Sequence, residues 1–246
     1  MTGMLRILPT FLLVVALIAA WQGLHLVIGA GALTSPWMTV SHLVSMMATG
    51  DLWSNVGATA KAFVYAMGLA LIGGIVLGVL LGVNRLAGAV AEPILLNLYA
   101  IPKVTLYPLV LLCFGLGLSS KVAFGVMHGL IPILLFTMNA IRQMRPVYLR
   151  TAGTLRLTPI QSLVHVLLPA ILPEVVAGVR LGFALTLLGV LIGEMFASQR
   201  GLGYMAVNAM GLGDIPTIMA VALLITIIAV TCNSLMLMLD KKLQHR

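Results

Sequence analysis

Long apolar runs separated by short polar stretches extend along the whole chain. Each of six runs is long enough to cross a hydrocarbon layer of about 30 Å, which takes roughly 20 helical residues. The pattern therefore predicts an all-α, polytopic membrane protein with six transmembrane helices, forming a single transmembrane domain over residues 1–246. The predicted spans are about 7–29, 59–83, 87–116, 122–141, 170–197 and 215–239.

The composition excludes a soluble globular protein. Hydrophobic residues make up 61% of the chain and charged residues 8%, and the mean hydropathy is +1.14, whereas about a quarter of the residues in soluble domains are charged. The first run follows Arg6 and could be taken for a secretion signal. It continues through Trp21 and His25 without a clean cleavage site, so we interpret it as a span.

Basic residues lie mostly on one side of the predicted spans. Short cytoplasmic loops retain Lys and Arg, so this bias places both termini in the cytoplasm. The net charge of +8 then follows from topology and contact with anionic membrane lipid, and it requires no nucleic acid. Nine of the 14 basic residues fall on the cytoplasmic side: Arg6, Arg85, Arg142, Arg145, Arg150, Arg156, Lys241, Lys242 and Arg246.

The longest predicted cytoplasmic loop joins the fourth and fifth spans, at about residues 142–168. Its apolar residues Leu149, Leu155, Leu163 and Val166 recur at roughly helical intervals. A loop this long exceeds what a connection needs. One interpretation is that short helices place these side chains in a groove of a cytoplasmic partner. The alternative, which the spacing supports equally, is an amphipathic helix resting on lipid headgroups.

A ridge of small residues runs along the second predicted span. Its members recur at every fourth position, so they share one face of a helix and allow a neighbouring backbone to approach closely. The ridge is either a contact that slides during transport or an ordinary static contact, and static packing is the stronger expectation. The members of this small-residue ridge are Ala66, Ala70, Gly74, Gly78 and Gly82.

The third run is too long and too interrupted for one straight helix. Pro102 and Pro108 each remove a backbone donor, and the freed carbonyl groups are tolerated at membrane depth only against protein or a water-lined cavity. This segment is therefore a candidate lining of a translocation path. Lys103 lies between the two prolines, where it either attracts an anionic solute or extends to a lipid headgroup.

The fifth span contains charges that lipid does not favour. Arg180 lies roughly 14 Å along the helix, and its cost at that depth indicates an interior position. Glu194 returns to within about 40° of the same face, with Leu187 and Leu191 between the two charges. This strip is interpreted as part of a path with an outer gate near Glu194. The alternative is that both charges fix helix packing through separate partners.

Known catalytic and metal-binding patterns are missing from the sequence. It has no phosphate-binding Gly-x-x-x-x-Gly-Lys-Ser/Thr, no His-Glu-x-x-His and no Gly-x-Ser-x-Gly. The two cysteines, Cys113 and Cys232, lie in apolar runs without metal-ligand spacing, and the five histidines are scattered. We therefore expect no catalytic residue, no metal site and no cofactor in this chain, so that energy for transport must come from another subunit.

The long loop resembles the cytoplasmic loop of binding-protein-dependent ABC importer permeases. The family signature runs Glu-Ala-Ala, three residues, Gly, nine residues, Ile, one residue and Leu-Pro. Val166, Leu168 and Pro169 match its end, and Ala152 matches its second Ala.

The rest of that signature differs in this chain. Arg150 stands at the Glu position, Thr151 at the first Ala and Arg156 at the Gly position. We expect Arg150 to meet a correspondingly altered groove on a dedicated ATPase. Gly153 lies three residues before the Gly position and is a candidate replacement for the turn.

Longer stretches resemble the nitrate, sulfonate and taurine subgroup of the same family. They include "LTSPWMTVSHLVSMMATGDLWSNVGATAKAF", "YAIPKVTLYPLVLLCFGLGLSSKV" and "ILPEVVAGVRLGFALTLLGVLIGEMFASQRGLGYM", and the similarity extends over roughly residues 5–245. The resemblance implies a location in the bacterial cytoplasmic (inner) membrane. It also implies that the long loop is the coupling helix, which docks on an ATPase. The ATPase-coupling residues would be Arg150, Ala152, Gly153, Leu155, Arg156, Leu163, Val166, Leu168 and Pro169.

The resemblance also implies the partners and the activity. A permease of this type works with a second permease copy, with ABC ATPase subunits that bind ATP and Mg, and with an extracytoplasmic solute-binding protein. The subgroup imports small anions such as sulfonates, taurine and nitrate. Close relatives import thiamine precursors and other heterocyclic solutes, so a solute of this kind is the alternative substrate. A secondary transporter is the alternative class, and transport without ATP would favour it.

Overall fold

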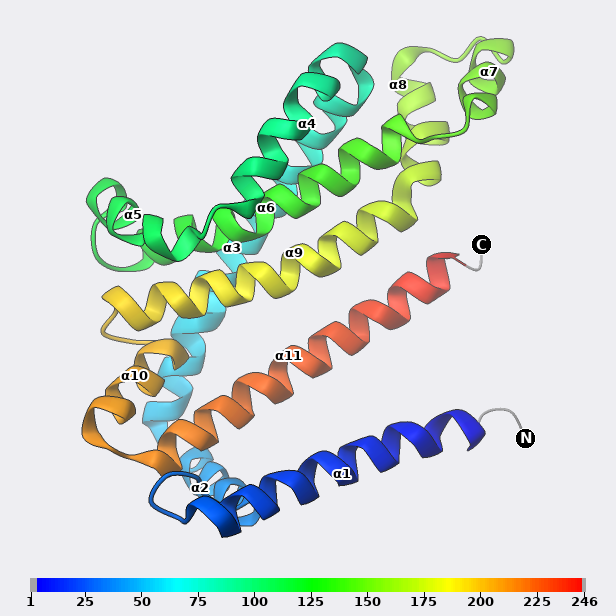
Figure 1. The fold of residues 1–246 in the computed structure, drawn as a ribbon. Helices are drawn as coiled ribbons and strands as arrows, with labels where there is room; N and C mark the ends of the chain where they lie inside the picture. The colour runs from blue at the N-terminus through cyan, green and yellow to red at the C-terminus, as the bar shows by residue number, and fades with distance from the viewer. Residues whose placement is uncertain (1–3, 245–246) are drawn as a thin grey trace.

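Helices form nearly the whole protein (Figure 1). The computed structural model describes residues 4–244 and contains no strand within them. Five of the described helices are long and apolar enough to cross a membrane, and a sixth crossing results if one bent pair of helices counts as a single span. The predicted all-α, polytopic fold is confirmed.

The elements follow the predicted order, with additional short helices between the spans. The long apolar helices are α1 (Met4–Ile28), α3 (Gly50–Val83), α6 (Leu118–Arg142), α9 (Leu168–Ala197) and α11 (Ile215–Gln244), and the bent pair consists of α4 (Arg85–Ala100) and η1 (Lys103–Leu106) with α5 (Tyr107–Phe114). The other elements are α2 (Pro36–Met47), α7 (Pro146–Thr154), α8 (Pro159–Ser162), the π-helical turn η2 (Leu163–Leu167) and α10 (Leu202–Leu212).

The second span begins earlier than predicted. The helix starts at Gly50, whereas the apolar pattern placed the start near residue 59. The polar residues Asn55 and Thr59 made the first turns resemble a loop, but both side chains are buried against other elements. A polar residue that is paired inside the protein does not end a helix, and the pairing depends on neighbours that are distant in sequence.

The core is built from α3, α6 and α9. The small-residue ridge is entirely buried and faces α6. A Cβ added at Gly78 would lie 2.6 Å from the Thr137 Cβ and 2.9 Å from the carbonyl oxygen of Leu134. The structure thus places the ridge at a contact within one subunit, where the two helix backbones approach closely.

The contact between α6 and α9 is equally close. A Cβ at Gly182 would lie 2.5 Å from Ile133 Cγ1 and 3.1 Å from the carbonyl oxygen of Gly129. Glycines on both helices therefore allow α9 to pack on the side of α6. With two neighbours at such short range, α6 is the most enclosed of the long helices, and 61% of its most apolar window is buried.

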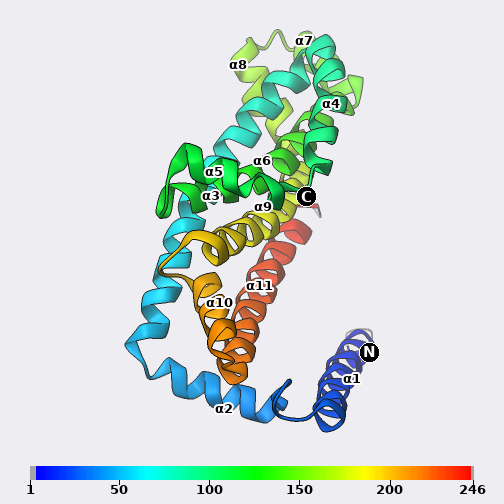
Figure 2. The ribbon, with the colours of Figure 1, turned by 60° about the vertical axis from the view of Figure 1, so that its left-hand side comes forward.

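The first helix lies apart from this core. Figure 2 shows α1 away from α3, α6 and α9 and joined to them through α2. None of its spanning window is buried. A hydrogen bond connects α1 to the segment that follows it. Trp21 Nε1 donates to the carbonyl oxygen of Thr34 at 3.0 Å.

The ends of the chain and the long loop lie on one side of the protein. In Figure 1 the two termini, α7 and α8 lie toward one end of the long helices, and α2 and α10 lie toward the opposite end. This arrangement agrees with an even number of crossings. We refer to the side with α10 as the outer side, following the predicted orientation.

Candidate functional site

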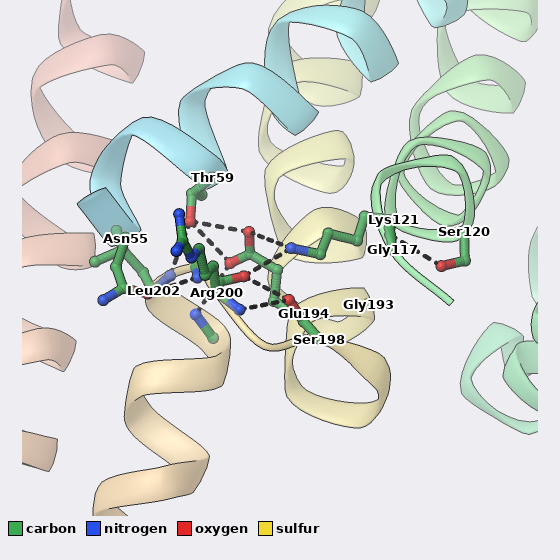
Figure 3. Close-up of polar contacts among 12 residues, drawn as sticks. Asn55, Thr59, Gly117, Ser120, Lys121, Gly193, Glu194, Ser198, Arg200 and Leu202 are labelled. Atoms are coloured by element: carbon green, nitrogen blue, oxygen red, sulfur yellow. Dashed lines mark hydrogen bonds and ion pairs between the residues drawn. The ribbon is translucent and has the colours of Figure 1, made fainter. Parts of the chain in front are cut away.

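A buried polar cluster lies where α3, α6 and α9 meet the start of α10 (Figure 3). At its centre is Glu194 of α9, whose side chain is fully buried. Its carboxylate accepts hydrogen bonds from the Thr59 hydroxyl at 2.8 and 3.0 Å and from the backbone N–H of Gly203 at 3.1 Å. The Lys121 ammonium of α6 lies 3.6 Å from the same carboxylate. Glu194 therefore contacts three other elements.

The same cluster holds the loop between α9 and α10. Lys121 Nζ donates a hydrogen bond to the carbonyl oxygen of Arg200 at 2.7 Å. The backbone N–H of Gly201 donates to Asn55 Oδ1 at 2.8 Å. The loop is thus attached to α6 on one side and to α3 on the other.

Backbone N–H groups hold the first residues of α10 in place by donating hydrogen bonds to side chains of other helices. Gly201 has a φ of +128°, a conformation that side-chain-bearing residues rarely adopt. A Cβ at this position would also overlap the Glu194 carboxyl group. The next N–H, of Leu202, donates to Thr59 Oγ1 at 2.8 Å. Since the first N–H groups of a helix have no partner within it, these contacts supply partners for the start of α10.

The buried cluster is suited to positioning and not to binding a solute. Its central carboxylate is closed to solvent, and its acceptors are used by the protein's own donors. Removing one partner of a buried charge pair typically costs about 3–5 kcal/mol, because the other charge is left unpaired. Within the described residues, no group of His, Cys, Asp and Glu could hold a metal ion.

Two cavities flank α10. The first, of about 880 Å³, lies between the turn before α6, the end of α9 and α10, and Phe196 and Tyr204 are part of its lining. We call it the outer cavity. The second, of about 550 Å³, lies between the start of α3 and α10, and its lining includes Asp51, Arg200 and Asp214. The helix that Glu194 holds therefore forms a wall of both.

The four residues of the strip predicted on the fifth span lie in different surroundings. Leu187 and Leu191 line an apolar cavity of about 150 Å³ together with Phe63 of α3. Arg180 is half-buried near the middle of α9. Glu194 faces the polar cluster, where its side chain is closed to solvent. A role of these four residues in solute passage or gating stays a prediction.

The predicted break in the third span is present. α4 and the η1–α5 segment are bent by 85° relative to each other, with Pro102 at the break. Pro108 lies in the first turn of α5, where its missing N–H costs nothing, and is exposed. Lys103 Nζ donates to the carbonyl oxygen of Tyr99 at 2.9 Å and lies 4.8 Å from the centre of the Tyr99 ring. Lys103 is thus held by its own segment.

The long loop forms α7, α8 and η2 between the ends of α6 and α9. Leu155 is 64% exposed, and Arg150, Gly153, Leu168 and Pro169 are exposed as well. Val166 is half-buried, and the side chains of Ala152 and Leu163 lie outside the described part of the chain.

Arg156 adopts an unusual backbone conformation. Its φ is +49°, in the left-handed region that glycine favours. Arg156 stands at the position where the family signature has Gly, so the turn forms in this chain with an arginine in place of the glycine. Gly153 lies inside α7 and does not provide that turn.

The end of α6 is tied to α4 just before this loop. Arg142 Nη1 donates to Glu92 Oε2 in an ion pair between the two helices. Nearby, Gly88 lets the start of α4 approach the end of α3, because a Cβ there would lie 2.6 Å from the carbonyl oxygen of Leu81. The loop therefore starts from a fixed helix end.

The sequence matches a known family along most of its length. The model of the family described as "Binding-protein-dependent transport system inner membrane component" matches residues 74–246. The chain belongs to this family. The long loop, the α6–α9 pair and the α10 segment all fall inside the matched part.

Relatives and solved structures agree with this assignment. The permease is 27% identical to the putative aliphatic sulfonates transport permease protein SsuC of Bacillus subtilis, over 94% of this chain and 85% of that protein. It is 33% identical to the riboflavin transport system permease protein RibX of Chloroflexus aurantiacus, over 86% and 79% of the two chains. A chain of the inward-facing MetNI methionine ABC transporter has the same fold, with a TM-score of 0.64 and 18% identity, over 78% of this chain and 97% of that one.

The comparisons confirm the predicted importer-permease family. The sequence analysis singled out Glu194 and missed its partners in the polar cluster. Lys121 and Thr59 looked like residues at the ends of spans, and nothing local marks them as partners of Glu194. One signal was present. The closely spaced glycines Gly201 and Gly203 follow Glu194 in the chain, and glycine allows a backbone to approach a neighbouring group closely.

Proposed function

We propose that the permease forms the membrane path of an ATP-driven importer. Two copies would work with two ABC ATPase subunits on the cytoplasmic side and with a solute-binding protein on the outer side. The permease would expose the path alternately to the two sides, while ATP and Mg act in the ATPase subunits. The family match carries this proposal, and the exposed α7–α8 segment supports it.

The α7–α8 segment has the properties of a docking element. Leu155 is 64% and Ile160 is 74% exposed on the side of the chain ends. Apolar side chains outside the membrane are stabilised when a partner covers them. We therefore assign this segment to the ATPase contact, in preference to a resting place on lipid headgroups.

A second copy of the permease is supported by α1. The helix lies apart from the core, with Phe11, Leu13 and Leu17 each about 60% exposed. Lipid covers part of this surface, and a second copy would cover the rest. A homodimer is therefore the proposed unit, with both termini in the cytoplasm.

The class of solute follows only loosely from the relatives. One is named for aliphatic sulfonates and another for riboflavin, so an anion and an uncharged heterocycle are both candidates. Lys103 and Arg180 are the basic residues that would serve an anion.

Reconstitution tests the proposed function. Proteoliposomes containing the permease, its ATPase subunits and its binding protein should accumulate solute only with ATP. They should fail with an ATPase variant that binds ATP without hydrolysing it. Uptake that continues without ATP would identify a secondary transporter instead. A reporter fused after Asp51 should read external and one fused after Gln244 cytoplasmic.

A further inference from the structure

The outer cavity beside α10 is large and carries no charge. Its volume of about 880 Å³ falls within the range of about 300–1,000 Å³ that is typical of small-molecule sites. The described residues that line it include no Lys, Arg, His, Asp or Glu. A ring system fits such a volume, and a nitrate or sulfonate group would leave most of it empty.

Three uncharged polar side chains of the outer cavity, which also line the second cavity, have no partner within the described chain. They are the Gln199 amide, the Tyr204 hydroxyl and the Asn208 amide. Amides and phenols offer both donors and acceptors. Phe196 and Tyr204 add two aromatic rings, which bind planar solutes by stacking or edge contacts.

The basic side chains near the outer cavity do not line it. Lys121 is held by Glu194 and by the carbonyl oxygen of Arg200. The Arg200 side chain lines the second cavity, where Asp51 and Asp214 provide two acidic groups for one basic group. An anion that leaves water needs a paired cation or several charged donors. Neither cavity beside α10 provides a surplus of positive charge.

We infer that the outer cavity binds an uncharged aromatic or heteroaromatic solute whose ring edge carries N–H and C=O groups. Gln199 and Asn208 would recognise that edge, and Phe196 and Tyr204 would contact the faces of the ring. This inference rests on the proposed importer function and selects the heterocyclic solute over the sulfonate or nitrate.

Cysteine protection tests the inference on the full-length permease in lipid nanodiscs. Val207→Cys places a thiol in the cavity lining while Gln199, Tyr204 and Asn208 stay intact. The two native cysteines are replaced by Ser. Met210→Cys is the matched control, because Met210 lies on the same helix, is 63% exposed and is not part of the lining.

The probes are cytosine, an uncharged aminopyrimidine, and methanesulfonate. At a concentration twice its Kd, cytosine should slow maleimide labelling of the Val207→Cys thiol about threefold, since the free fraction of sites is 1/(1 + [L]/Kd). Labelling of the Met210→Cys thiol should not change. Adding Asn208→Leu to the Val207→Cys protein should remove the protection.

The inference is overturned by either of two results. Equal or stronger protection by methanesulfonate would show an anion site, and no protection by either probe would show that the cavity holds no solute. The labelling requires neither ATPase nor binding protein. A failure here therefore leaves the importer function intact, and a failure of ATP-driven uptake in the reconstituted complex would refute that function whatever the labelling shows.

Discussion

Lys121 of α6 and Glu194 of α9 form a charge pair that is almost completely buried, with 3.6 Å between the ammonium and the carboxylate. Through this pair and through Thr59, three helices of the core hold the start of α10. The position of α10 in turn shapes both cavities on the outer side. The pair thus connects the packing of the membrane core to the walls of the candidate solute site.

Breaking this pair should destabilise the permease. Lys121→Met leaves the Glu194 carboxylate without its cation, so we expect a loss of about 3–5 kcal/mol. Adding Glu194→Gln to that variant should recover part of the loss, because the unpaired charge is removed. Thermal unfolding followed by size-exclusion chromatography of a fluorescent fusion would measure both changes. Lys61→Met is the control, since Lys61 is exposed on α3. Equal effects of Lys61→Met and Lys121→Met would contradict this assignment.

The small-residue ridge should not tolerate a larger side chain. A Cβ at Gly78 would lie 2.6 Å from Thr137, so Gly78→Val should separate α3 from α6 and cost about 1–3 kcal/mol. Gly68 lies on the same helix with nothing within 4 Å of an added Cβ. Gly68→Ala should therefore leave stability unchanged or raise it by about 0.5–1 kcal/mol. The yield of monodisperse protein after heating distinguishes the two variants. A Gly78→Val protein as stable as the Gly68→Ala protein would rule out close packing here.

Restoring glycine at Arg156 should stabilise the loop. A residue with a side chain in the left-handed region costs roughly 1–2 kcal/mol, which glycine avoids. Arg156→Gly should therefore slow proteolysis of the α7–α8 segment, as measured by the rate of limited trypsin cleavage at Arg150 of α7, a site that both proteins share. Gly153→Ala is the control, because Gly153 is helical and open. Faster cleavage in the Arg156→Gly protein would show that the arginine side chain itself holds the turn.

An acidic residue at Leu155 should disrupt coupling. In a complex with the ATPase, Leu155→Asp would bury an unpaired charge and cost several kcal/mol at the interface. The ATPase should then fail to co-purify, or its stimulation by the binding protein should be lost, while the permease still inserts. Leu155→Met keeps the side chain apolar and should retain both properties. Full recovery of ATPase and of stimulated hydrolysis with Leu155→Asp would favour the segment's resting on lipid headgroups.

Some features of this protein depend on local sequence, and others depend on contacts between residues that are distant in the chain. The sequence by itself determined the spans apart from the start of the second, together with the break at Pro102 and the long loop, because transfer of an apolar run into lipid and the loss of a backbone donor at proline are local properties. The family followed from the signature and the longer similar stretches. The partners of Glu194 could not be obtained this way. Thr59 lies 135 residues away in the chain, and the helix crossings decide that it meets Glu194. The same crossings buried Glu194 among these partners and created the cavities beside α10.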